Sequence, residues 1–247
     1  MGKYPFPPVT EAVIDIRFEA PLTEDLQAKL SRKLAKAYPS EQIVTNHGLI
    51  VHVDGNKSQV KQEEQKVFRR ANDDQNEICL VLSNNLIVSQ LAVYPGWDDF
   101  IARFTSTYDC FKKVCGYRKI TRIGLRYINR IDISEKDGIV PYEEYLNIYV
   151  LLPKVLDPTD GYSLQLHKRF PDLKAEVVIN SASTPSPLPN CVAFILDIDV
   201  SRAVDPPQHD REIFDFLLQG RAIKNEIFEA AISDASRKLF YDDQRLT

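Results

Sequence analysis

Glycine is scarce in this sequence, with only 9 among 247 residues. No glycine-rich phosphate loop of the Walker or dinucleotide type is found, which disfavours the common nucleotide-binding folds. Cysteine is also scarce, and 4 residues fall far short of a disulfide scaffold. No basic segment followed by an apolar one marks a secretory signal. We therefore expect a protein of the reducing cytoplasm.

The sequence has no large excess of either sign of charge. Lys and Arg total 31 against 35 for Asp and Glu, which gives a formal net charge of −4. This balance provides no overall attraction to nucleic acid or to anionic lipid, so contact with nucleic acid or a phosphorylated ligand has to be local. Hydrophobic residues make up 44% and charged residues 27% of the chain. This composition predicts a globular protein with a substantial core, without a membrane span.

Signatures of catalysis, metal binding and cofactor binding are missing from the sequence. There is no G-x-S-x-G motif to indicate a nucleophile with its base. Cys110 and Cys115 have neither the C-x-x-C spacing nor the four-residue spacing of one helical face. His47 and His52 would point to opposite faces of a strand. We predict no catalytic residues, no metal and no cofactor, and whether the chain is an enzyme stays open.

The first part of the chain predicts a strand and a helix. The segment KYPFPPVTEAVIDIRFEA begins with three prolines, which favour an extended lead-in, and continues with alternating apolar and polar residues. That alternation predicts a half-buried strand. Thr23 is a suitable N-cap for a helix over about 23–37, and Pro39 marks its end.

A β-meander and a second helix are predicted next. Strand-like segments cover about 42–53 and 66–71, and the runs EICLVL and LIVSQLAV are joined by the polar turn at 83–85. The apolar residues from Trp97 to Val114 keep helical spacing, and Gly116 is suited to the position just past the helix end.

The second part of the chain shows a similar order of elements. It starts with the strand ITRIGLRYINRIDI and a short helix-like stretch, PYEEYLNIYVLL. Strands follow at about 162–170, 174–181 and 191–200, with SASTPSPLPN as an exposed loop between the last two. A helical tail extends from about Asp210 to Phe240, and Gly220 is expected to break or kink it.

The order β-α-β-meander-α thus occurs twice, in halves at 1–118 and 119–247, which suggests an old duplication. We predict a two-layer α+β fold with a mainly antiparallel sheet and helices on one face. No long linker separates the halves, so we expect one compact body.

The segment RIGLRYINR places three arginines, Arg122, Arg126 and Arg130, on one face of a strand. At about 3.3 Å per residue, successive arginines along the strand would lie about 13 Å apart, and together they would suit an extended anion such as a row of phosphates. Alternatively, the arginines form a cross-strand charge ladder with acids of neighbouring strands, such as Asp15 and Glu19 or Asp197 and Asp199. Carboxylates within about 4 Å of two or more guanidinium groups favour the ladder.

The helical tail is a candidate interaction surface. Its apolar residues cover more area than one narrow stripe requires, and they include Phe214, Leu218, Ile223 and Phe228. Part of this area would bury a homodimer contact or a protein partner. The alternative is that the tail packs across a wide sheet.

Two stretches, PPVTEAVIDIRFE at 7–19 and RIGLRYINRI at 122–131, together with the tail KNEIFEAAIS at 224–233, resemble a sporadically distributed bacterial protein family without an established function. The resemblance covers the full length. It implies a bacterial cytoplasmic protein, often encoded near mobile or defence-related genes, and it supplies no catalytic residues.

Two functions are compatible with these observations. The first is a non-enzymatic interaction or accessory protein of a bacterial multi-gene system, as the resemblance and the missing catalytic signature suggest. The alternative is an α+β protein that binds a nucleotide, an RNA end or another phosphorylated ligand on the arginine-lined strand.

Overall fold

The structure is a computed structural model, and it describes residues 4–54, 57–135, 140–150, 153–156 and 161–241. For residues 46–54 and 57–65 the description covers the backbone alone.

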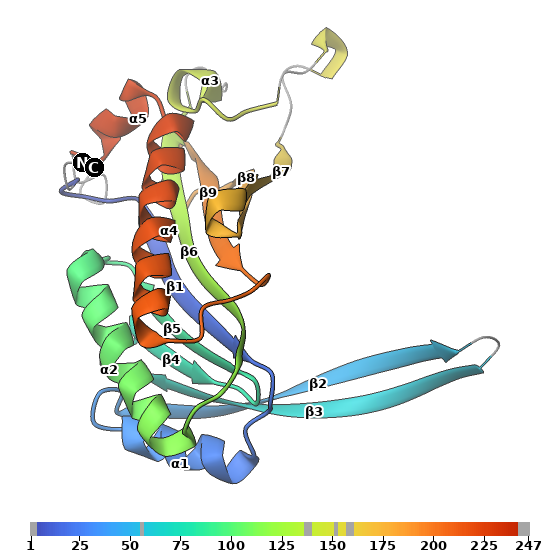
Figure 1. Ribbon diagram of the computed structural model, residues 1–247. Coiled ribbons are helices and arrows are strands. Elements are labelled where there is room, and N and C mark those ends of the chain that lie inside the picture. The colour runs from blue at the N-terminus through green and yellow to red at the C-terminus, as the bar shows by residue number, and fades with distance from the viewer. Residues whose placement is uncertain (1–3, 55–56, 136–139, 151–152, 157–160, 242–247) are drawn as a thin grey trace. The chain divides into compact units, whose positions relative to one another are not determined.

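The described residues form an α+β fold, as predicted, in which helices pack on an antiparallel sheet of nine strands (Figure 1). The strands follow one another in the sheet in the order β2-β3-β4-β5-β1-β6-β9-β8-β7. They are β1 (Val9–Phe18), β2 (Ser40–Asp54), β3 (Lys57–Ala71), β4 (Glu77–Val81), β5 (Asn85–Leu91), β6 (Ile120–Ser134), β7 (Ser163–Phe170), β8 (Ala175–Pro185) and β9 (Cys191–Arg202). The helices are α1 (Glu24–Leu34), α2 (Trp97–Cys115), α3 (Tyr142–Tyr145), α4 (Asp210–Ala231) and α5 (Asp234–Leu239), with 3-10 turns at Lys154–Leu156 and Pro171–Leu173.

The chain divides into two compact units. Unit 1 comprises Met1–Val13, Leu91–Tyr94 and Ile123–Thr247, and unit 2 comprises Ile14–Gln90 and Pro95–Arg122. These boundaries differ from the sequence halves because β1 and β6 each contribute residues to both units.

Unit 2 is built around α1, α2 and the meander. The Thr23 hydroxyl accepts a hydrogen bond from the backbone N–H of Leu26, which confirms the predicted N-cap of α1. The end of α2 is also confirmed, because Gly116 has φ 70° and its N–H donates to the carbonyl of Lys112. The rings of Phe18 and Phe111 stack at 4.6 Å between centroids and join β1 to α2 in the core.

One strand of unit 2 is much longer than predicted. The sequence indicated a strand at about 66–71, whereas β3 begins at Lys57 and pairs with β2 from Ser40↔Ala71 to Asp54↔Lys57. The added segment KSQVKQEEQ is polar, so it carries no apolar alternation. Its extended conformation is set by the ladder with β2.

Unit 1 places the predicted helical tail against the sheet, but the expected break at Gly220 is wrong. Helix α4 continues through Gly220, which is buried beside Val200 of β9 and Leu125 of β6. The break comes instead at Ile232, which is extended and pairs with Leu146. The Ser233 hydroxyl then caps α5 by accepting from the N–H groups of Ala235 and Ser236.

Two other boundaries in unit 1 differ from the sequence prediction. The helix expected in PYEEYLNIYVLL is a single turn, α3. The strand expected to end at 181 continues to Pro185, so the loop before β9 shortens to residues 186–190. The single turn of α3 ends where Leu146 pairs with Ile232, and β8 is longer because its ladder with β9 continues to Pro185↔Val192.

Candidate functional site

The arginine-bearing strand has the alternation predicted for it. Along β6, Ile123, Leu125, Tyr127 and Ile131 are buried, whereas Arg122, Arg126 and Arg130 are on the opposite face. In unit 1, α4 packs against Leu125 and Val200. We call the opposite face of β6, β9, β8 and β7, which bears Arg126, the polar face.

Arg122 lies in unit 2 and is engaged by a carboxylate. Its Nη1 is 2.7 Å from the Oδ2 of Asp15 on β1. Asp15 also accepts hydrogen bonds from Arg17 and Asn85. Through Asp15, these hydrogen bonds link β1 to its neighbours β5 and β6.

Arg126 is engaged even more fully. Its Nε and Nη2 each donate to one oxygen of Asp197, both at 2.7 Å, in a bidentate pair. The hydrogen bond to Asp197 raises the pKa of Arg126. Asp197 is on β9, so the predicted pairing of Arg126 with a neighbouring strand is confirmed.

The Arg126–Asp197 pair continues as a hydrogen-bonded chain across the polar face. The Nδ2 of Asn180 on β8 donates to Asp197, and the Nε2 of Gln165 on β7 donates to Asn180. His167 follows, with Nε2 3.1 Å from Gln165 and Nδ1 3.2 Å from the Glu176 carboxylate. These side chains tie four neighbouring strands together, which is the role of a ladder and not of an open anion site.

Arg130 differs from the other two arginines because most of its guanidinium group stays available. Only its Nε is engaged, by the Oδ2 of Asp132 at 3.1 Å, and the Ser186 hydroxyl holds the other oxygen of Asp132 at 2.6 Å. Among the described residues, the Nη1 and Nη2 groups of Arg130 have no hydrogen-bond partner. Arg122 and Arg126 thus pair with carboxylates of neighbouring strands, as the ladder predicts, whereas the carboxylate beside Arg130 is on its own strand and Arg130 retains two parallel donors.

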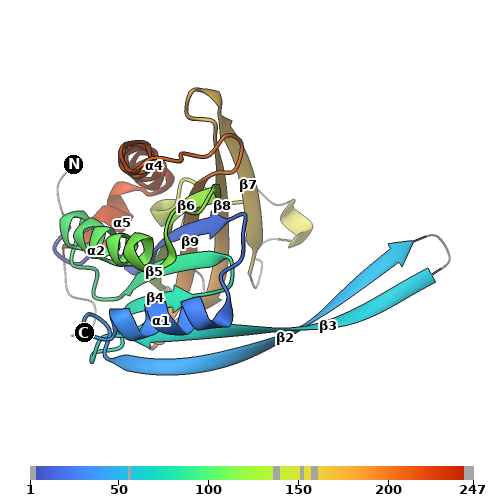
Figure 2. The same cartoon turned by 60° about the horizontal axis from the view of Figure 1, so that its bottom comes forward.

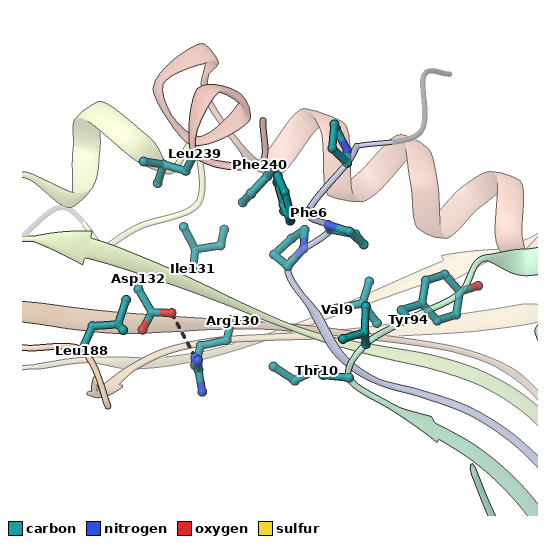
Figure 3. A pocket seen from close by; sticks show the side chains of 15 residues that line it. Phe6, Val9, Thr10, Tyr94, Arg130, Ile131, Asp132, Leu188, Leu239 and Phe240 are labelled. Carbon is teal, nitrogen blue, oxygen red and sulfur yellow. Dashed lines mark hydrogen bonds and ion pairs between the residues drawn. The ribbon is translucent and has the colours of Figure 1, made fainter. Parts of the chain in front are cut away.

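Arg130 also lines a cavity of about 310 Å³ in unit 1 (Figure 3). The cavity exists because residues 4–8, the proline-containing lead-in before β1, cannot continue the ladder of β1. The N–H of Arg130 donates to the carbonyl of Pro8 at 2.9 Å, whereas Pro7 and Pro8 have no N–H to offer. Phe6 turns away and donates its N–H to the carbonyl of Phe240. The space between this lead-in and β6 is the cavity.

The outermost strand of unit 1, β7, presents an unpaired edge (Figure 2). The Ser183 N–H donates to the carbonyl of Tyr162, so the alternating ladder turns the backbone groups of even-numbered β7 residues toward β8. The N–H and C=O groups of Ser163, Gln165, His167 and Arg169 therefore point outward. In the described part of the chain nothing pairs with them.

Side chains on both faces of β7 are exposed. Leu166 shares a face with the buried Val177 and Ile179 of β8, yet it is 41% exposed. Lys168 lies on that same face and Arg169 on the polar face, and within the described residues neither cation has an ion-pair partner. Sequence reasoning missed this edge. The only sequence pattern that could have indicated it is Leu164 and Leu166, spaced as on one face of a strand, followed by the adjacent cations Lys168 and Arg169.

The four tail residues proposed as an interaction surface do not form one exposed patch. Phe228 is buried and packs near Phe240, with ring centroids 6.1 Å apart. Phe214 and Ile223 are partly buried, and Leu218 is 55% exposed. Only Phe214 and Leu218 are four residues apart and share one face of α4. A homodimer through this helix stays a prediction.

Among the described residues, no group of three or more His, Cys, Asp or Glu side chains is placed to hold a metal ion. The same part of the chain contains no helix that is long and apolar enough to cross a membrane.

Comparison with known proteins gives no family. No protein-family model matches the chain, and no curated protein matches it significantly. Among solved structures, the di-domain ARO/CYC StfQ from the steffimycin biosynthetic pathway is 10% identical with a TM-score of 0.20, over 94% of this chain and 96% of that one. The S. pombe Pct1 RNA triphosphatase in complex with the Spt5 CTD is 7% identical with a TM-score of 0.15, over 92% and 85%. Scores this low do not show a shared fold.

Proposed function

We propose that this protein is a non-enzymatic interaction protein that binds an extended, acidic segment of a partner protein along β7. The observation that carries this proposal is the outward row of backbone donors and acceptors on Ser163, Gln165, His167 and Arg169. An extended peptide that adds a strand to a free sheet edge gains main-chain hydrogen bonds along its length. Such a binding role agrees with the accessory function that the sequence resemblance implies.

The side chains of β7 favour a partner of a particular chemistry. An added strand with apolar residues on the face of Leu166 would cover that exposed side chain and extend the apolar layer of Val177 and Ile179. Acidic residues on the polar face of the added strand would meet Arg169, and the nearby Lys168 on the face of Leu166 makes the edge more positive; neither cation has a carboxylate partner among the described residues. If a second copy of this chain paired through its own β7, two such pairs of cations would lie along the contact between the two strands and repel one another. A foreign acidic segment therefore suits this edge better.

Hydrogen exchange of the full chain tests the proposal at single residues. The probe is a synthetic peptide in which Val and Glu alternate, compared with the same peptide carrying Lys in place of Glu. With the acidic peptide, the amides of Gln165, His167 and Arg169 should become protected, while the amides of Leu166 and Lys168 are already protected by β8. If the outward amides exchange equally fast with and without the acidic peptide, the proposal is overturned.

Reversing the charges on β7 gives a second, independent test of the proposal. The double variant Lys168→Glu, Arg169→Glu should bind the acidic peptide about tenfold more weakly, because Arg169 shares the polar face with the Glu residues of the peptide and its attraction becomes repulsion, while the change at Lys168 makes the edge more negative still. The matched control is Lys36→Glu, Lys113→Glu, which makes the same change in net charge at exposed positions of unit 2. Equal weakening in both double variants would mean that only net charge matters, and this would contradict binding at β7.

A further inference from the structure

The cavity beside Arg130 combines a fixed pair of donors with mainly apolar walls. Besides Arg130, Asp132 and Thr10, its lining includes Phe6, Val93, Leu188 and Phe240. Figure 3 shows Arg130 and Asp132 projecting from one side of β6 and Ile131 from the other side, where Phe240 of the C-terminal segment also lies. The cavity therefore has a polar part around Arg130 and an apolar part that follows the lead-in. This division is typical of sites that bury the body of a small molecule and orient it by one charged group.

The guanidinium group of Arg130 is held in place before any ligand arrives. Ser186 orients Asp132, and Asp132 in turn holds the Nε of Arg130. The side chain is 37% exposed, and its Nη1 and Nη2 groups have no partner among the described residues. Two parallel N–H donors at the end of a guanidinium group match the two oxygens of a carboxylate.

The charge of the site limits which anion it can take. Arg130 contributes one positive charge and Asp132 one negative charge, at 3.1 Å from each other. A single carboxylate can accept from Nη1 and Nη2 on the side away from Asp132. A dianion would place a second negative charge near Asp132, where repulsion opposes it.

We infer that this cavity binds a small organic monocarboxylate, whose carboxylate accepts from the Nη groups of Arg130 and whose apolar body lies against Leu188 and the lead-in. A cavity of about 310 Å³ suits a compact body, such as one aromatic ring. This inference rests on Arg130 and the lead-in, and it is independent of the β7 edge.

Calorimetric titration of the full chain with phenylacetate tests the inference, with phenylacetamide as a neutral analogue and phenyl phosphate as a dianion. Wild type should bind phenylacetate at least tenfold more tightly than either analogue. Arg130→Gln should weaken phenylacetate binding at least tenfold, and Arg130→Lys should weaken it by less, because Lys keeps the charge and loses the paired donors. Leu188→Ser should weaken the binding of phenylacetate and phenylacetamide alike.

Arg126→Gln is the matched control, because Arg126 is on the same strand, is also beside a carboxylate, and does not line the cavity. Its affinity for phenylacetate should equal that of wild type. The inference is overturned if phenylacetate shows no saturable binding, or if Arg130→Gln binds as wild type does. Tighter binding of phenyl phosphate would overturn the assignment to a monocarboxylate. Circular dichroism of each variant separates lost binding from lost folding.

Discussion

The bidentate pair of Arg126 and Asp197 joins one half-exposed residue to one buried residue. The Arg126 side chain is 47% exposed and that of Asp197 is 6% exposed. Arg126→Ala would leave the Asp197 carboxylate with the single amide of Asn180. We expect a loss of about 1–2 kcal/mol in the free energy of unfolding, below the range for a fully buried pair because water can reach the vacated side.

Urea denaturation measures this loss, and Arg211→Ala is its control. Arg211 is a fully exposed arginine at the start of α4 whose Nε lies 3.9 Å from Asp215. Its removal should change the free energy of unfolding by less than about 0.5 kcal/mol. If both variants lose the same amount, the buried carboxylate is not what Arg126 stabilises.

Lys224 is a buried cation on α4 whose ammonium lies 3.9 Å from the centroid of the Tyr127 ring. Burial, followed by the nearby Arg221, lowers the pKa of Lys224 from 10.5 to about 8, while Glu229 acts in the opposite direction. The folded state therefore binds this proton more weakly than the unfolded state between about pH 8 and 10.5. Because the unfolded state carries more protons in this window, the contribution of Lys224 to stability rises with pH through it.

Lys224→Met tests this linkage. The variant should have a larger free energy of unfolding than wild type at pH 7. The difference between the two free energies should shrink by up to about 3 kcal/mol as the pH rises from about 8 to 10.5. Comparing the two proteins in urea at each pH cancels the other groups that titrate there. A difference that stays constant with pH would show that Lys224 is charged in the folded state throughout.

At the scale of the element, the packing around a glycine inside α4 leaves room for one methyl group. A Cβ at Gly220 would lie 3.5 Å from the Cγ1 of Val200 and 3.7 Å from the Cδ2 of Leu125, which are ordinary contact distances. Gly220→Ala should therefore raise the free energy of unfolding by about 0.5–1 kcal/mol, since alanine favours the helix. Gly220→Leu should lower it by about 1–3 kcal/mol through overpacking. Urea midpoints of the two variants on opposite sides of wild type confirm this prediction, whereas a loss in Gly220→Ala contradicts it.

The elements that could be predicted are those whose own residues determine them. Helix α2 has apolar residues at helical spacing and a glycine at its end, and β6 has strict alternation, so both were predicted within a residue or two. The polar first part of β3 and the continuation of α4 through Gly220 depend on the neighbouring β2, Val200 and Leu125. Such contacts between distant parts of the chain leave no local pattern.

The candidate sites were predictable only in part, for the same reason. Alternation placed three arginines on one face of β6, but it could not indicate that Asp197 would engage Arg126 fully and that Asp132 would engage Arg130 by one nitrogen. The position of β7 at the sheet edge is a property of strand order. Strand order is not encoded in the residues of β7 alone.

At the scale of the whole molecule, the two units share two strands. β1 continues from unit 1 into unit 2 between Val13 and Ile14, and β6 continues from unit 2 into unit 1 between Arg122 and Ile123. Unfolding of one unit would release part of each strand from its ladder, so the backbones of β1 and β6 connect the stability of one unit to that of the other. We therefore expect the chain to unfold in a single cooperative transition.

The single tryptophan makes this expectation testable, because Trp97 lies in unit 2. Its fluorescence reports on unit 2, whereas far-ultraviolet circular dichroism reports on the whole chain. Arg126→Ala removes an interaction that lies entirely within unit 1. In a cooperative chain this variant should lower the urea midpoint seen by Trp97 fluorescence as much as the midpoint seen by circular dichroism. An unchanged fluorescence midpoint together with a two-step circular dichroism curve would show that the units unfold independently.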